Sequence, residues 1–207
     1  MLCGVTLTAQ AQDPAHELRP IPWPSPGESI KLGPFVDYLQ DEDGTLTLQD
    51  VLPEGSHASH WLRHDAQTPN FGFTENTYWF RVRMMPPTKP TEVSWLFSIA
   101  YPLLDEIDIH LLRSDDPLNQ NEHIQLGDRV PFEDRALKHR QFLAPIEEPT
   151  ENMDIYIRVQ STSSLQVPME LLEEREFLIE DEARVIAYGL LFGAMLVMIL
   201  YNIIIYL

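Results

Sequence analysis

Charged and aromatic side chains alternate with apolar ones along three short stretches, TYWFRVRM, EIDIHLL and DIYIRVQS. One side of the first stretch carries Trp79 and Arg81, and the same side of the last carries Arg158. Proteins bind sugars with an aromatic face against the C–H side of the ring and with planar polar groups on the hydroxyls. The pattern therefore predicts a glycan-binding surface. The alternative is a solvated outer face, or one covered by a loop with its Arg and Asp residues paired.

Catalysis has less support in the sequence. Asp105 and Asp108 would be the acid and base of a glycosidase, but we expect one at the lip of a strand and the other on its face. The sequence contains no Gly-x-Ser-x-Gly elbow, Walker loop or dinucleotide fingerprint. We therefore expect no catalytic residues, no enzyme activity and no cofactor.

One stretch, HASHWLRH, resembles a metal-binding cluster through His57, His60 and His64. Neutral imidazoles at these spacings share one face of a helix and are good zinc or copper ligands. However, the first and the last would lie about 10.5 Å apart along the helix axis, too far for one ion. We expect a solvated polar face and no metal site, with Trp61 as a core or rim anchor.

The segments that carry these side chains are predicted to be half-buried strands. Strict alternation over TYWFRVRM, VSWLFSIAY, EIDIHLL and DIYIRVQS is typical of strands with one face on a core. QFLAPIEE and LQVPMELL add two more, whereas Asp41-Glu42-Asp43-Gly44 predicts a polar turn because it lacks the spacing of an EF-hand. About seven or eight strands with no long helix among them favour an all-β antiparallel sandwich.

The last residues differ from all that precede them. From Val185 to Leu207 there is no charged residue, and Asn202 is the strongly polar one. As a helix this run spans about 34 Å, enough to cross ~30 Å of hydrocarbon. Its Leu, Ile, Val and Phe residues favour insertion by on the order of 5 kcal/mol. We therefore expect a transmembrane helix over residues 185–207.

The first residues indicate export. Residues 1–11 hold a short apolar stretch that ends in Ala9-Gln10-Ala11, the small-x-small pattern of a signal-peptidase site. Because the basic n-region is missing, we interpret this segment as a residual signal-peptide-like segment. The one cysteine, Cys3, lies within it, so the exported part would rely on its core and not on disulfides. Residues 12–28 are predicted to be an extended, Pro-rich lead-in.

The net charge of −18 lies almost wholly before the apolar run. Such a surface repels nucleic acid and anionic lipid headgroups, so neither is an expected partner. Six acidic residues between Glu173 and Glu182 stand directly beside the apolar run. Because cytoplasmic flanks favour Lys and Arg, this flank is expected to face outward, with the chain entering the membrane from outside.

Four longer stretches follow one another in the order and at the intervals of a bacterial family. From about Ser29 to Leu172 the sequence resembles the type-two extracellular domain of the seven-transmembrane receptors with diverse intracellular signalling modules (7TMR-DISM). The apolar run is similar to the first membrane helix of that family. The stretches that carry the resemblance are WLRHDAQTPNFGFTENTYWFRVRM, WLFSIAYPLLDEIDIHLL, LGDRVPFEDRALKHRQFLAPI and IYIRVQSTSSLQVPMEL.

The resemblance implies a jelly-roll sandwich similar to carbohydrate-binding modules. It places the N-terminal domain in the periplasm and the helix in the bacterial inner membrane. It also implies the remaining membrane helices and a cytoplasmic output domain, commonly a histidine kinase or a diguanylate cyclase, outside this sequence.

The resemblance also singles out polar residues on loops and strand ends, where scaffolds usually hold ligands. For the charged members the alternative is an internal network of ion pairs that pins long loops. Together with Trp79, Arg81 and Arg158 from the strand faces, the expected ligand-binding residues are Tyr101, Asp105, Asp128, Arg135, His139, Arg140 and Ser161.

The junction with the membrane is predicted to be stiff. No Gly or Pro lies between Pro168 and Gly189, so a helix is expected over residues 173–184 without a hinge before the membrane. A stiff junction transmits a shift of the sandwich, whereas a Gly/Ser linker would absorb it. Gly189 and Gly193 form a small-residue strip for helix packing, and Asn202 lies about 180° round the helix. Two such faces suit a helix with neighbours on both sides, although Gly is common in membrane helices.

These patterns together predict a sensory domain at residues 29–172, passing ligand state through the juxtamembrane helix to the membrane. The expected partners are a carbohydrate or related small polar ligand, the bilayer, other transmembrane helices of the same receptor, and a second copy in a homodimer. Ligand would favour one arrangement of the sandwich, and differential affinity would set how far the equilibrium moves. The alternative is an interaction module that pairs with itself or with another protein and takes no small ligand.

Overall fold

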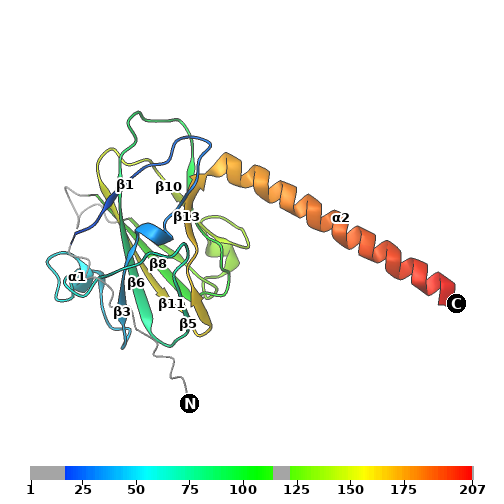
Figure 1. The fold of residues 1–207 in the computed structure, drawn as a ribbon, viewed down its shortest axis with the longest axis horizontal. Helices are drawn as coiled ribbons and strands as arrows, with labels where there is room; N and C mark the ends of the chain where they lie inside the picture. The colour runs from blue at the N-terminus through cyan, green and yellow to red at the C-terminus, as the bar shows by residue number, and fades with distance from the viewer. Residues whose placement is uncertain (1–16, 114–121, 207) are drawn as a thin grey trace, which may run out of the picture.

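The computed structural model describes residues 17–113 and 122–206 and shows a β-sandwich from which one long helix projects (Figure 1). The layers are a seven-stranded sheet and a four-stranded sheet, with a separate two-stranded pair. The predicted all-β sandwich followed by an apolar helix is confirmed. Among the described strands, one pairing departs from the antiparallel prediction: Pro20–Pro22 runs parallel to the strand that contains Arg83.

The larger sheet has the order β4-β3-β6-β11-β8-β9, with β1 also paired to β6. Its central strands, β6 and β11, carry the predicted binding residues Trp79, Arg81 and Arg158. The strands are β1 (Pro20–Pro22), β3 (Asp37–Asp41), β4 (Leu62–Arg63), β6 (Thr77–Met85), β8 (Glu106–Arg113), β9 (Glu122–Leu126) and β11 (Met153–Gln160).

The smaller sheet has the order β10-β7-β13-β2, and β12 pairs with β5 apart from it. LQVPMELL, expected as one strand, is divided between β12 and β13, because Val167 donates its N–H to Pro69 and Pro168 has no N–H to donate. These strands are β2 (Ile30–Lys31), β5 (Asn70–Phe73), β7 (Trp95–Ile99), β10 (Phe142–Ile146), β12 (Ser164–Gln166) and β13 (Met169–Glu173). The helices are α1 (Leu48–Val51), α2 (Glu174–Tyr206) and the 3-10 turns η1 (Gly33–Phe35) and η2 (Phe132–Asp134).

The main core lies between the two sheets and follows the alternation of the sequence. Phe80 and Val82 of β6 face Phe97 and Ile99 of β7, and all four side chains are fully buried, as is Ile157 of β11. Full burial of one such side chain stabilises the fold by about 1.5–3 kcal/mol relative to leaving it exposed. The alternation therefore places the core-facing residues correctly, and β8 is half-buried as predicted. The prediction of half-buried strands is wrong for β6, β7 and β11, because nearly all of their residues are buried on both faces.

A second apolar cluster lies on the opposite, outer face of the larger sheet, and we call it the outer cluster. Residues 42–61 fold back over this face and place α1 on the sheet beside β3 and β6 (Figure 1). Trp61, predicted as a core or rim anchor, is fully buried here, and its indole N–H donates to the Val51 carbonyl at 3.1 Å. The members of the outer cluster are Leu39, Leu48, Val51, Trp61, Trp79, Leu112 and Tyr156.

Two short-range devices shape the covering segment. The Asp41 carboxylate accepts the N–H groups of Thr45 and Leu46 at 3.2 and 3.0 Å, which forms the predicted polar turn. Gly44 completes that turn with φ +65°, a value that side chains disfavour. A capping box between Thr47 and Asp50 then starts α1.

Helix α2 follows β13 without an intervening loop and is continuous over 33 residues. Phe177 in its first turns packs against Leu96, Leu143 and Leu172 on the outer face of the smaller sheet. α2 is the one helix of the described part that is long and apolar enough to cross a membrane, and an 18-residue stretch of it has a mean hydropathy of 2.2. Figure 1 shows α1 and α2 on opposite sides of the sandwich.

Acid should loosen the covering segment. Hydrogen bonds from the Thr47 side chain and backbone hold the pKa of Asp50 below its ordinary value of 3.8. A carboxylate with a lowered pKa contributes stability above its unfolded pKa, and that stability is lost as the pH falls through the folded pKa. Below about pH 4 we expect faster NMR-measured exchange of the Trp61 indole N–H.

Asp50→Asn should show this faster exchange already at neutral pH. The Phe80 amide, in the centre of the larger sheet, is the internal control. If exchange of the Phe80 amide accelerates in parallel with that of the Trp61 indole N–H, the whole domain is unfolding. The idea of a local opening at α1 would then be wrong.

Candidate functional site

The outer face of the larger sheet is divided into a covered half and an open half. Strand register puts Trp79, Arg158 and Asp108 in one row across the sheet. Residues 42–61 cover the β6 end of that row, whereas its β8 end stays in contact with solvent. A ligand in solvent can therefore reach the β8 end of the row but not the β6 end.

The covered half contains two of the predicted ligand-binding residues. Trp79 is 1% exposed and Arg81 is 3% exposed. The Arg81 guanidinium donates to Asp37 through two nitrogens, each at 3.2 Å, and lies 4.5 Å from the centre of the Trp61 ring. A ligand would have to displace the covering segment to reach Trp79. This half therefore has the covered arrangement, with Arg and Asp paired, that was the alternative to a binding surface.

Burial dominates the electrostatics of the covered half. It raises the pKa of Asp37 and lowers the pKa of Arg81, against the attraction between the two charges. Burial, with the Asp154 carboxylate adding, raises the pKa of Tyr156 to about 12. Removing one member of a buried ion pair leaves an unpaired charge, which destabilises the fold. Because Arg81 also lies against the Trp61 ring, we assign Asp37 and Arg81 to the positioning of the covering segment.

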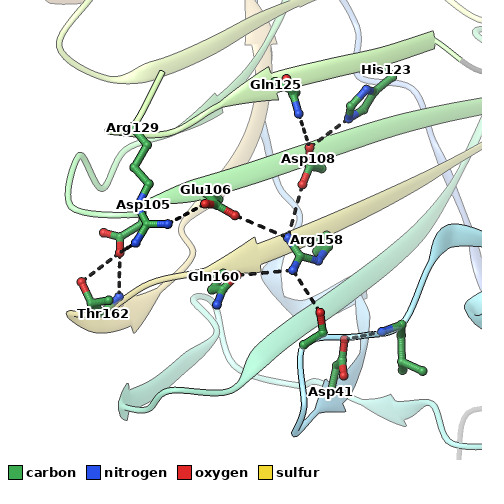
Figure 2. A network of polar contacts seen from close by, with 12 residues as sticks. Asp41, Asp105, Glu106, Asp108, His123, Gln125, Arg129, Arg158, Gln160 and Thr162 are labelled. Atoms are coloured by element: carbon green, nitrogen blue, oxygen red, sulfur yellow. Dashed lines mark hydrogen bonds and ion pairs between the residues drawn. The ribbon is translucent and has the colours of Figure 1, made fainter. Parts of the chain in front are cut away.

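The open half is organised around Arg158, whose side chain is 18% exposed (Figure 2). One terminal nitrogen lies 3.5 Å from Asp108 and 3.8 Å from Glu106. The other lies 3.3 Å from the Gln160 side-chain oxygen and 3.5 Å from the Gly44 carbonyl. Hydrogen bonds at such distances are weak, so these guanidinium donors have capacity for a better acceptor.

Besides Arg158, Asp108 has two partners on β9. His123 and Gln125 contact one of its carboxylate oxygens at 2.9 and 3.1 Å. The side chains of β8, β9 and β11 therefore form one connected polar surface, with amide, imidazole, carboxylate and guanidinium groups in neighbouring positions (Figure 2).

The network continues to the loops at the same end of the sandwich. Arg129 contacts Glu106 at 2.6 Å and Asp105 at 3.5 Å. Asp105 also accepts the hydroxyl and the N–H of Thr162 at 2.9 and 3.1 Å. Asp105 therefore joins the loop before β8 to the loop after β11. We call the group formed by Asp105, Glu106, Asp108, His123, Gln125, Arg129, Arg158, Gln160 and Thr162 the open network.

Ser161 and Tyr101 lie near this end but have internal roles. The Ser161 hydroxyl is buried, donates to the Leu103 carbonyl at 3.1 Å and also accepts the N–H of Ser163. Tyr101 is half-buried and packs against the main core. Ser161 thus holds the loop that presents Thr162 rather than facing solvent.

The other predicted residues belong to residues 127–141, which we call the β9–β10 loop. Arg135 donates to the Gly127 carbonyl at 3.1 Å and lies over the ring of Phe142 at 5.1 Å. Asp128 is exposed, and its N–H donates to the Leu104 carbonyl. These contacts pin the loop through backbone carbonyls and an aromatic ring, whereas the alternative interpretation of the charged residues had proposed ion pairs.

His139 and Arg140 lie away from the open network, against α2. Both contact the carboxylate of Asp181, with the His139 ring nitrogen at 3.3 Å. The structure therefore separates the predicted site residues into a covered group, an open group and a group at the membrane helix.

Sequence reasoning missed an exposed aromatic side chain on β5, the strand that pairs with β12 just after Thr162. Phe73 is 87% exposed and lies opposite Ser164 in the β5–β12 pair, two residues beyond Thr162. It also missed Arg129, His123 and Gln125. In the strand EHIQL, His123 and Gln125 alternate with Ile124 and Leu126, which assigns them to one face. Only register against β8 shows that they lie beside Asp108.

The three histidines of HASHWLRH do not share a helix face. The segment forms turns that lead into β4. The rings of His57 and His60 lie 5.2 Å apart, whereas His64 contacts the Gly33 carbonyl at 2.8 Å. Within the described ranges, no group of three or more His, Cys, Asp or Glu residues is placed to hold a metal ion.

The two arginines of the open network should differ in their effect on stability. Arg158→Ala should lower the free energy of unfolding by about 1–3 kcal/mol, because it leaves Asp108 and Glu106 close together without their shared cation. Arg129→Ala should cost less than about 1 kcal/mol, because the Arg129 side chain is 59% exposed. Urea unfolding followed by tryptophan fluorescence measures both changes in the free energy of unfolding. A larger loss for Arg129→Ala than for Arg158→Ala would show that Arg158 is not the central residue of the network.

Comparison with known proteins gives the family. The family model described as 7TMR-DISM extracellular 2 matches residues 33–173. No curated protein matches the chain. One solved structure, described as "Structural basis for the promiscuous specificity of the carbohydrate-binding modules from the beta-sandwich super family", is similar over 70% of this chain and 53% of its own, about half its length. The identity is 10% and the TM-score 0.31.

A likeness at that TM-score says nothing of what this chain binds. The family match, by contrast, covers most of the sandwich and ends at Glu173, where α2 is about to begin. The sandwich with an apolar helix directly after it is the arrangement that the resemblance implied. The chain belongs to the 7TMR-DISM extracellular 2 family and is an extracellular receptor domain joined to a candidate membrane-spanning helix.

Proposed function

We propose that this chain is the periplasmic ligand-sensing part of a bacterial transmembrane signalling receptor, and that its ligand is a carbohydrate held at the open network. One observation carries the proposal. One half of the outer face of the larger sheet is covered by residues 42–61, yet the part around Arg158 is left open with loosely held polar groups. Preformed but under-satisfied donors and acceptors are what a polyhydroxylated ligand needs.

The charge of the open network narrows the ligand class. Its ionisable members are three carboxylates, from Asp105, Glu106 and Asp108, and two guanidinium groups, from Arg129 and Arg158, with His123 beside them. The whole chain also carries a net charge of −18. Electrostatic complementarity disfavours sialic or uronic acids here and favours neutral or amino sugars.

Phe73 supplies the aromatic element that Trp79 does not. Because Trp79 is buried beneath α1, no sugar can stack on it in this arrangement. Phe73 is exposed at the same end of the sandwich as Thr162 and Asp105. An aromatic ring beside planar polar groups is the usual pair of devices for sugars.

The membrane side of the proposal rests on α2. We propose that the sandwich lies in the periplasm, that residues 185–207 cross the inner membrane, and that the ligand state passes through the first turns of α2 to an output domain outside this chain. The absence of a loop between β13 and α2 supports a stiff connection. Gly189, Gly193 and Asn202 remain the proposed contacts for further membrane helices of the same receptor.

A thermal-shift screen tests the proposed function. The chain, in detergent, is heated with a panel of neutral, amino and acidic oligosaccharides. A ligand at 100 times its Kd adds about 2.7 kcal/mol of stability, a shift of about 5–10 °C for a domain of this size. We expect such a shift with a neutral or amino sugar and none with an acidic one.

Phe73→Ala is the matched variant, because an 87% exposed side chain contributes little to folding. Without sugar, its melting temperature should equal that of the wild type. With the active sugar it should lose most of the shift. A flat screen over the whole panel with a well-folded chain would favour the protein-interaction module, and an unchanged shift in Phe73→Ala would remove Phe73 from the site.

A further inference from the structure

The first turns of α2 are fastened to the sandwich by a polar contact as well as by Phe177. Asp181 stands three residues before Arg184, the last charged residue ahead of the apolar run, and its carboxylate contacts three cationic or titratable side chains. These are His139 at 3.3 Å, Arg140, and Arg184 at 3.8 Å. His139 also packs edge-on against the Phe177 ring, with ring centres 5.1 Å apart.

Two of those partners come from the end of the β9–β10 loop, which touches both the sandwich and the helix. His139 and Arg140 directly precede β10. The Asp181 side chain is 17% exposed, so the contact is partly shielded from solvent, and charge-assisted hydrogen bonds are stronger there than at the surface. The loop end therefore restrains the helix one turn before the apolar run begins.

The other end of the β9–β10 loop is bound to the open network. Gly127 has φ +126°, and a Cβ there would lie 2.3 Å from the Asp105 carbonyl oxygen, so the two backbones are in direct contact. The N–H groups of Asp128 and Arg129 donate to Leu104 and Asp105 at 2.9 and 3.2 Å. The Arg129 side chain then completes the network through Glu106 and Asp105.

One side chain connects the two ends of the loop. Arg135 donates to the Gly127 carbonyl at 3.1 Å and to the His139 carbonyl at 3.5 Å. Its guanidinium is also held between the rings of Phe132 and Phe142, at 5.6 and 5.1 Å. Arg135 therefore links the start of the loop at Gly127 to its end at His139 through a single side chain.

We propose that the β9–β10 loop couples the open network to the membrane helix, with Asp181 as the positioning residue that receives the loop's movement. The inference deepens the proposed function and rests on it for its biological use. A ligand that draws Arg129 or Asp105 toward itself shifts Gly127, and Arg135 carries the shift to His139 and Arg140. These side chains then reposition Asp181 and the turns of α2 that lead into the membrane.

A double-mutant cycle read by hydrogen–deuterium exchange tests the coupling without any ligand. The protein is the whole chain in lipid nanodiscs, and the exchange of residues 174–182 is measured by mass spectrometry. Arg129→Gln should accelerate that exchange several-fold, on the order of three- to tenfold, although Arg129 does not touch α2. Asp181→Asn should accelerate it directly by a similar factor.

The decisive variant is the double one. In the Asp181→Asn background, Arg129→Gln should have no further effect on residues 174–182, because the route through Asp181 is already broken. An effect of Arg129→Gln that stays confined to residues 103–106 and 127–130 would overturn the coupling. An effect on α2 that is equal with and without Asp181 would overturn the role of Asp181.

Glu180→Gln is the control for charge, since it removes one carboxylate from the neighbouring, exposed position of the same helix. It should leave the exchange of residues 174–182 unchanged. Arg140→Gln repeats the test from the loop side and should behave as Asp181→Asn does. Because no sugar is present, failure here is distinct from a flat sugar screen, which would leave this coupling intact.

Discussion

The covering of the outer face of the larger sheet is the constraint on which the rest of this structure depends. An antiparallel sheet packs one face on a core and must either cover the other or give it to solvent. Here Trp61 and α1 cover Trp79 and Tyr156, while the ends of β8, β9 and β11 stay open. The same fold-back buries Arg81 with Asp37, and it brings the Gly44 carbonyl within reach of Arg158. Covering one half therefore shapes the other into a bounded polar surface.

A second consequence concerns the path by which the open network and α2 can be connected. The open network and α2 lie on different sheets, so a signal between them has to cross the sandwich or go round it. The interior between the sheets is packed with fully buried apolar side chains such as Phe80 and Phe97, which transmit strain but offer no polar switch. The β9–β10 loop goes round the edge, with charged groups at both of its ends and Arg135 between them. This makes the loop the more direct polar connection between the open network and α2, and the one on which the proposed coupling rests.

Parts of the site were visible in the sequence and parts were not. Alternation in TYWFRVRM and DIYIRVQS correctly assigned Trp79, Arg81 and Arg158 to one face of a sheet, because side chains in a strand alternate with a period of two. It could not show which of them would be covered, since the covering residues lie some 20–40 positions earlier in the chain than β6. Alternation in HIQL could assign Gln125 to a strand face but not to a place beside Asp108, which comes from register. Phe73 and Arg129 had no such signal, because their positions come from strand pairing and from loop closure.

The sequence by itself determined the class of this protein: an acidic, exported β-sandwich of the 7TMR-DISM extracellular 2 family, followed by an apolar helix without a flexible hinge. Composition, period and the order of motifs suffice for that, because they are local properties of the chain. Only the tertiary structure decided that Trp79 is buried, that Arg158 stays partly exposed with long contacts, and that His139 and Arg140 contact α2 through Asp181. These are contacts between residues far apart in sequence, and they depend on which strands pair and on which loop folds over which face.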